Sequence, residues 1–291
     1  MQNQQRNLVL GFRDAERLDP ILTPNEKFDP GFQAEGVTCA VCHVKDGAIV
    51  GPYGDARAPH PTRQDSAMTK GFGVCQRCHV VSGSRWDTFY RIPPCGTVAE
   101  IQEAGATPDC TGCHMPEVTR PLWAGGPPRA GRQHLWRGGH TPASVQQALS
   151  VDVDLRARPD GRRVATVTLT NVGADHYLPT GTPDRHLTLE LELRSAEGRV
   201  LLRREHALER VILWRPIIVD LWDTRLPAKE PRTYELEFPV DAATSPATLD
   251  VRVRYHLLGE ARRKRIGYEN LEPISYLIYE QRVPVSAEAG N

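Results

Sequence analysis

Hydrophobic and polar residues alternate along the second half of the chain, which is the pattern of strands with one buried face. The alternation is cleanest over four ranges, Leu149–Ala157, Leu187–Leu193, Tyr234–Phe238 and Leu249–Leu257. It is weaker over Val164–Thr170, Arg199–Arg203 and Ile274–Val285. The pairs Asp160-Gly161 and Glu197-Gly198 lie between such runs and favour hairpin turns. We therefore expect about seven antiparallel strands in an immunoglobulin-like β-sandwich, with closure into a barrel as the alternative.

The first half of the chain has no such period. It holds short apolar clusters, most of the glycine and proline, and all seven cysteines. This composition predicts an irregular region made mostly of helix and loop. The expected fold class is thus α+β with two domains, one over residues 1–146 and the β-sandwich over residues 147–291.

Six of the seven cysteines belong to the motif Cys-x-x-Cys-His, which occurs three times in the first half. The motif residues are Cys39, Cys42, His43, Cys75, Cys78, His79, Cys110, Cys113 and His114. This spacing is the attachment signature of c-type haem, in which two thiols bond to one porphyrin and the adjacent histidine ligates its iron. The sequence therefore predicts three covalently bound haem c groups in residues 1–146.

Other uses of paired cysteines fit the motifs less well. A structural zinc site needs four ligands from two cysteine pairs, and a histidine directly after each of three pairs does not suit that count. A thioredoxin-like pair needs one motif between a strand and a helix. Disulfides within such short spacings are strained and give the histidines no role.

An electron carrier keeps both axial positions of each iron filled, whereas an enzyme leaves one open for substrate. Outside the motifs, the first half contains three histidines, His60, His134 and His140, which we predict as the sixth ligands of the three irons. Met68 is the competing ligand. All six predicted axial histidines thus precede residue 148, so we expect the haem region to need no ligand from the second half.

Residues 36–145 resemble the haem region of periplasmic multihaem cytochromes c, both in Cys-His-Met-Pro at 113–116 and in the segment from His134 to His140. The resemblance implies bis-histidine haems packed closely in a row. Nitrite-reducing members of that family replace one attachment histidine by lysine, and all three motifs here keep histidine.

The segment Asn171–Gly181 resembles one that follows the haem region in multihaem cytochromes, with Asp175 where glycine is usual. His176 and His186 are predicted to make structural hydrogen bonds, with docking on a haem edge as the alternative.

Charge and hydropathy limit the possible partners. Lys and Arg total 36, and so do Asp and Glu, so no basic excess favours nucleic acid. We find no apolar run of the length that a spanning helix needs. Because covalent haem attachment occurs outside the bacterial cytoplasm, we expect a periplasmic or extracellular protein whose export signal lies outside this chain.

These observations predict an electron-transfer cytochrome that exchanges electrons with redox proteins or neighbouring cytochrome subunits, with an oligomer possible. One alternative is an oxidoreductase with one open iron, acting on a small nitrogen compound or oxyanion. Another is a haem-bearing subunit of a larger electron-conducting assembly or filament.

Three further features have more than one interpretation. Cys95 is read as a small buried hydrophobic residue, with an intermolecular bridge or a reactive thiol as alternatives. The apolar segment Ile212–Trp222 is read as packing against the haem region, with a partner surface as the alternative. The basic run Arg262–Arg265 is read as a solvated turn.

Overall fold

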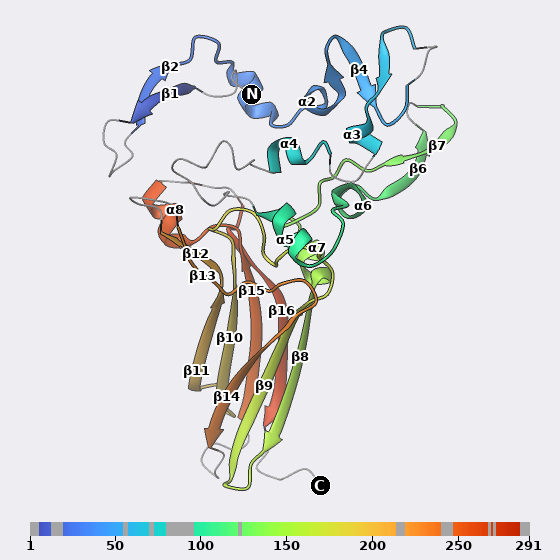
Figure 1. The fold of residues 1–291 in the computed structure, drawn as a ribbon. Coiled ribbons are helices and arrows are strands. Elements are labelled where there is room, and N and C mark those ends of the chain that lie inside the picture. The colour runs from blue at the N-terminus through green and yellow to red at the C-terminus, as the bar shows by residue number, and fades with distance from the viewer. Residues whose placement is uncertain are drawn as a thin grey trace.

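The computed structural model describes residues 6–12, 20–54, 58–69, 73–79, 96–121, 124–213, 219–239, 247–266, 269 and 272–285. Long strands form one end of the molecule, and short helices and small sheets form the other (Figure 1). The long strands come from the second half of the chain and the small elements mostly from the first.

Seven long strands form two antiparallel sheets. One sheet has the order β14-β9-β8 and contains β8 (Leu149–Ala157), β9 (Arg162–Asn171) and β14 (Pro231–Pro239). The other has the order β11-β10-β15-β16 and contains β10 (His186–Ser195), β11 (Val200–Leu208), β15 (Ala247–His256) and β16 (Ser275–Val285). Each range that the alternating pattern predicted as a strand is present as one of these seven.

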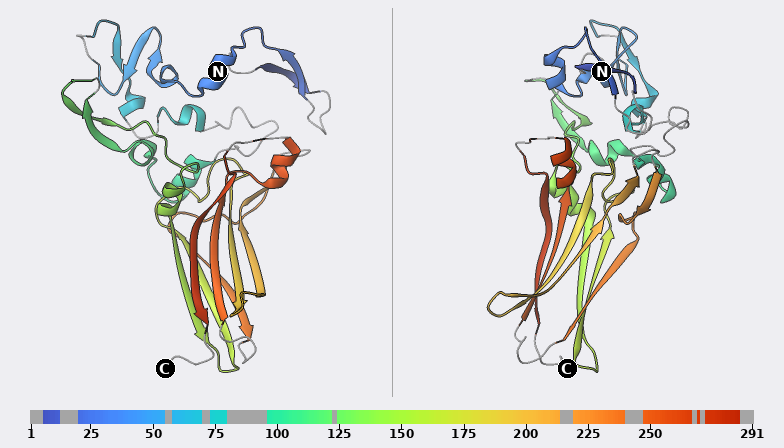
Figure 2. Two further views of the ribbon diagram at one scale, coloured as in Figure 1. Left: turned by 180° about the vertical axis from the view of Figure 1, so that it is seen from behind. Right: turned by 90° about the vertical axis from the view of Figure 1, so that its left-hand side faces the viewer.

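The two sheets lie as facing layers that share one hydrophobic core (Figure 2). Leu169 and Phe238 enter it from one sheet, and Leu189 and Val251 from the other; all four are at most 1% exposed. Burying a side chain of this size stabilises the fold by about 1.5–3 kcal/mol. Helix α7 (Pro142–Ala148), which spans the boundary predicted at residue 146, also contributes buried side chains to this core.

Both predicted hairpin turns form where a glycine adopts positive φ. Gly161 has φ 82°, and the turn closes with the Arg158 amide donating to the Arg162 carbonyl at 2.8 Å. Gly198 also has φ 82°, and there the Ser195 amide donates to the Arg199 carbonyl at 2.9 Å. Glycine takes this conformation without the steric cost that a Cβ imposes.

The described residues of the first half contain short strands in three small sheets. The pairs and the triplet are β1 (Asn7–Phe12) with β2 (Pro20–Pro24), β3 (Val44–Lys45) with β4 (Ala48–Gly51) and β5 (Thr62–Gln64), and β6 (Glu117–Pro121) with β7 (Pro128–Arg132). Its helices are α1 (Pro30–Glu35), α2 (Cys39–His43), α3 (Ser66–Thr69), α4 (Gln76–His79), α5 (Thr97–Glu103) and α6 (Cys110–His114). No helix in the described residues exceeds the seven residues of α5, α7 and α8 (Glu260–Ile266).

The predicted fold class, an α+β chain with a helix-and-loop haem domain before an immunoglobulin-like β-sandwich, is wrong. The described residues are mostly strand, with few helices and several small separate sheets. Strands such as β3 and β5 have only two and three residues, which is too short for an alternating pattern to be recognised.

Two of the ambiguous segments are partly described, and Cys95 lies outside the described residues. The apolar segment contributes to a hairpin of β12 (Arg210–Leu213) and β13 (Val219–Asp223), in which Leu213, Leu221 and Trp222 are about half exposed. The basic run lies in α8, a helix rather than the predicted turn. None of the described helices is long and apolar enough to cross a membrane.

Candidate haem-binding site

Each Cys-x-x-Cys-His motif lies on a single turn of helix. The first and third motifs are the whole of α2 and α6, and α4 carries the second from Gln76 to His79. Residues three apart lie on one face of a helix, so α2 and α6 each bring their two cysteines to the same side. Helices α4 and α6 lie on the side of the small sheets that is nearer the long strands, whereas α2 lies beside β4 (Figure 1).

Backbone carbonyls fix the protonation of the first and third motif histidines. His43 Nδ1 lies 2.9 Å from the Val50 carbonyl oxygen in β4, and His114 Nδ1 contacts the Arg137 carbonyl oxygen. A carbonyl oxygen only accepts, so Nδ1 carries the proton and donates in both rings. The neutral ring then has an unprotonated Nε2, which is the nitrogen that a metal ion binds.

Each of these two histidines has a second histidine close by. The ring centroids of His43 and His134 are 6.0 Å apart with the planes at 44°, and those of His114 and His176 are 6.4 Å apart with the planes at 9°. His134 and His176 also donate from Nδ1 to backbone carbonyls, at 3.0 Å to Arg132 and 2.8 Å to Tyr177. In the neutral form of all four rings, Nε2 is therefore the nitrogen that can act as a ligand.

The spacing of the two pairs fits an iron atom between the rings. A metal–imidazole bond is about 2 Å long and a ring centroid lies about 1.1 Å behind the bonding nitrogen, so two axial ligands have centroids about 6.2 Å apart. The observed 6.0 and 6.4 Å bracket this value. The residues present thus fit a haem at the first and third motifs.

The other predicted sixth ligands lie elsewhere. His60 and His140 are exposed, and in the described part of the chain neither forms a ring pair with His43 or His114. His140 follows Gly139, whose carbonyl accepts a hydrogen bond from the Tyr276 hydroxyl. Met68 is half-buried in α3.

The second and third motifs are neighbours in space. The thiols of Cys75 and Cys110 hydrogen-bond to each other, which lowers the pKa of Cys75 to about 6 and raises that of Cys110. Haems attached at these two cysteines would therefore lie close together. The side chain of Cys78 is outside the described residues.

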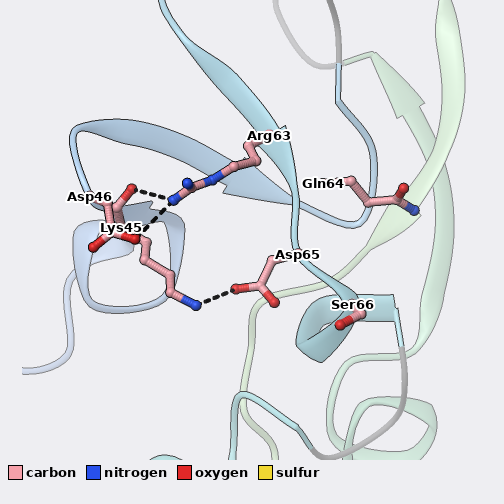
Figure 3. A pocket seen from close by; sticks show the side chains of 6 residues that line it. All are labelled: Lys45, Asp46, Arg63, Gln64, Asp65 and Ser66. Carbon is pink, nitrogen blue, oxygen red and sulfur yellow. Dashed lines mark hydrogen bonds and ion pairs between the residues drawn. The ribbon is translucent and has the colours of Figure 1, made fainter.

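Asp65 connects the first and second motifs. Its carboxylate lies 3.7 Å from Lys45 Nζ, two residues after the first motif, and 3.2 Å from Arg77 Nη2, inside the second. Figure 3 shows Lys45 reaching toward Asp65 at the edge of a polar hollow, beside the pair formed by Arg63 and Asp46. A hydrogen bond from the Ala67 amide and the two cations lower the pKa of Asp65, so this link stays ionic at neutral pH.

Sequence reasoning gave His176 a structural hydrogen bond and did not predict its contact with His114. The two residues are 62 positions apart, and no local pattern relates them. The one available signal was the histidine within the Asn171–Gly181 segment. Burial lowers the pKa of His176, which keeps its ring neutral.

Among the described residues, no group of three or more His, Cys, Asp or Glu side chains could hold a bare metal ion. A haem differs from a bare ion because the porphyrin supplies four of the six iron ligands and the protein supplies two.

No protein-family model and no curated protein matches this sequence. Among solved structures, a penta-haem cytochrome c552 from Thermochromatium tepidum is similar over 98% of this chain and 76% of its own, with a TM-score of 0.65 and 20% identity. An ApaA protein from Bordetella pertussis matches 46% of this chain and 91% of its own, with a TM-score of only 0.24 and 19% identity. The chain therefore shares its fold, over nearly its whole length, with a multihaem cytochrome c.

Proposed function

We propose that this protein is a three-haem electron carrier. The two cysteines of each motif hold one haem by thioether bonds, and His43, His79 and His114 are the proximal ligands of the three irons. When bound, haem supplies one-electron exchange between ferric and ferrous iron. The likeness in fold to a penta-haem cytochrome supports this use, although this chain has three motifs.

The observation that carries the proposal is the pairing of His43 with His134. Two imidazoles at 6.0 Å, each with its Nδ1 proton held by a backbone carbonyl, are prepared to ligate one iron from both sides. An iron with both axial positions filled exchanges electrons without binding substrate. The pairing thus favours a carrier over an oxidoreductase.

For the iron of His79, the candidate sixth ligands are His60 and His140. Either imidazole would complete the bis-histidine set. His60 lies between Pro59 and Pro61, which restrict the backbone on both sides, and His140 follows two glycines. Replacing each by alanine separately assigns this ligand, because only the true ligand leaves a high-spin haem when it is removed.

We place the protein outside the cytoplasm, where haem is attached to such motifs and where its partners would be redox proteins or neighbouring cytochrome subunits. Its balanced charge supports neither nucleic acid nor a strongly charged partner.

The mass of the denatured holoprotein tests the proposal. Thioether bonds survive denaturation, so the mass should exceed the 32.4 kDa of the chain by about 1.8 kDa for three haems. A mass equal to that of the chain, or a gain that corresponds to zinc, would refute it. The variant His134→Ala should keep the same gain in mass from covalent haem and convert one haem of the three to high spin.

A further inference from the structure

The segment Asn171–Gly181 leaves the end of β9 and approaches the haem-binding helices. His176, in the middle of this segment, lies nearly parallel to the proximal ring of the third motif at 6.4 Å. This spacing is close to the about 6.2 Å expected between the centroids of two imidazoles that bind one iron from opposite sides.

A second pair of histidines shows what direct stacking looks like in this protein. The rings of His186 and His256 are parallel within 3°, but their centroids are only 4.2 Å apart, which leaves no space for iron. His256 Nε2 also contacts the Thr188 hydroxyl at 2.9 Å. The centroids of His114 and His176 are thus about 2.2 Å further apart than those of this closely stacked pair.

Asn171 holds the backbone of the segment from the side of the sheet. Its side chain is fully buried, donates to the His176 carbonyl at 2.7 Å and accepts from the Ala174 amide at 3.1 Å. A buried amide that is satisfied on both ends fixes the loop around it, because either bond is costly to lose. The loop is thus prearranged before any cofactor is present.

Glu100 of α5 holds the segment from the other side. Its buried carboxylate accepts from the Tyr177 amide at 3.1 Å and from the Thr180 hydroxyl at 2.6 Å, on either side of the turn that follows His176. Arg225, also buried, completes the charge pair at 2.8 Å and lies over the Tyr177 ring at 4.9 Å. Two buried charges and two hydrogen bonds thus fasten the residue next to His176 to the haem region.

We propose that His176 is the sixth ligand of the iron whose proximal ligand is His114. The inference rests on the proposed function, because it needs a haem at the third motif. The conformation of the Asn171–Gly181 segment then has a role, which is to deliver an imidazole from the strand-rich half into the haem region. It follows that the axial ligands are not confined to the first 148 residues and that one of the four candidate distal histidines is spare.

The test compares two histidine variants of the holoprotein. His176→Ala should leave three covalent haems by mass and convert one third of the low-spin haem signal to high spin in electron paramagnetic resonance and absorption spectra. Added imidazole should restore the low-spin signal by occupying the opened position. His186→Ala is the matched control, because it removes a stacked histidine of the same half, and it should leave all three haems low-spin.

If the His176→Ala protein does not incorporate haem, a second variant at the same position tests the proposal. His176→Met keeps a ligand at the position, and thioether ligation should raise the midpoint potential of one haem while two stay unchanged.

Three low-spin haems in His176→Ala, or three unchanged potentials in His176→Met, would overturn the assignment of His176 and leave the three-haem carrier intact. A wild-type mass without haem would instead refute the carrier itself, which separates the two failures.

Discussion

At the scale of single residues, the chemistry of the site depends on backbone carbonyls. Four histidines, His43, His114, His134 and His176, each direct the Nδ1 proton to a carbonyl oxygen. This hydrogen bond selects the tautomer, orients the ring and makes Nε2 a better electron donor to a metal. The sequence supplies the imidazoles, whereas the fold supplies the carbonyls that prepare them.

Glu100 should influence the midpoint potential and spin state of a haem with which it makes no direct contact. Glu100→Gln removes the charge that faces buried Arg225 and weakens the bonds to Tyr177 and Thr180, so it should cost about 2 kcal/mol of unfolding free energy. If Glu100 positions His176, the variant should also shift the midpoint potential of one haem and increase its high-spin fraction. Denaturant unfolding and a spectroscopic redox titration measure the two effects. A loss of stability with all three potentials unchanged would show that Glu100 is only structural.

Asp250 should make the sheet sensitive to acid. Its buried carboxylate contacts Arg194 at 3.1 Å, Arg252 at 2.9 Å and Arg282 at 2.7 Å. Burial raises its pKa, but the Arg282 hydrogen bond and the three cations together lower it below the usual 3.8. A carboxyl group whose pKa is lower in the folded protein than in the unfolded chain stabilises the fold. The stabilisation is complete when the pH is above the usual pKa of 3.8, and it is lost as the pH falls through the lower pKa of the folded state.

Asp250→Asn should therefore reduce the unfolding free energy by about 2 kcal/mol at pH 7 and flatten its fall with acid, measured by urea unfolding between neutral pH and pH about 3. Asp154→Asn, at an exposed pair with Arg156, is the control and should change little. An equal loss in both variants would contradict the role given to Asp250.

Among helices and strands, the sequence predicted the elements that have a regular hydrophobic period or contain a local motif. The seven long strands were recognisable from alternating sequence patterns, and in β14 every second residue is indeed less exposed than its neighbours. The three Cys-x-x-Cys-His motifs were recognisable because their residues are adjacent in sequence. The short strands were missed because backbone pairing, rather than side-chain pattern, defines them.

The pairing of His176 with His114 was missed for a different reason. It depends on where the β9–β10 connection meets α5, and that contact is made by Glu100, Tyr177 and Thr180 from distant parts of the chain. No spacing of residues along the sequence indicates a tertiary contact of this kind. His134 was predicted as a ligand from the count of histidines outside the motifs, but that count did not show that its ring lies beside that of His43.

Gly173 should be indispensable to the packing between the Asn171–Gly181 segment and α7. A Cβ at this position would lie 2.8 Å from Ala148 Cα and 2.9 Å from the Gln147 carbonyl oxygen, both backbone atoms that cannot move aside alone. Gly173→Ala should therefore cost about 1–3 kcal/mol, measured by thermal or denaturant unfolding. Gly131→Ala in β7, where a Cβ meets nothing within 4 Å, is the control. Equal stability of the two variants would contradict this close approach.

At the scale of the whole molecule, the strand-rich half and the haem-binding half are connected by charge as well as by chain. The buried pair of Glu100 and Arg225 joins α5 to the residues after β13, and the Tyr276 hydroxyl of β16 bonds to Gly139. These contacts connect the strand-rich half to α5 and to the segment before α7. They would hold the proposed haem sites at set separations, as the proposed electron carrier needs.

The central claim is that every iron in this protein is closed by two protein ligands. Carbon monoxide titration of the reduced holoprotein, followed by absorption spectroscopy, tests it most directly because this ligand binds ferrous haem only at an open or readily vacated position. If each iron has two protein ligands, modest concentrations of carbon monoxide should change the spectrum of none of the three haems. Stoichiometric binding at one haem per chain would contradict it and would identify an open iron, as an oxidoreductase requires.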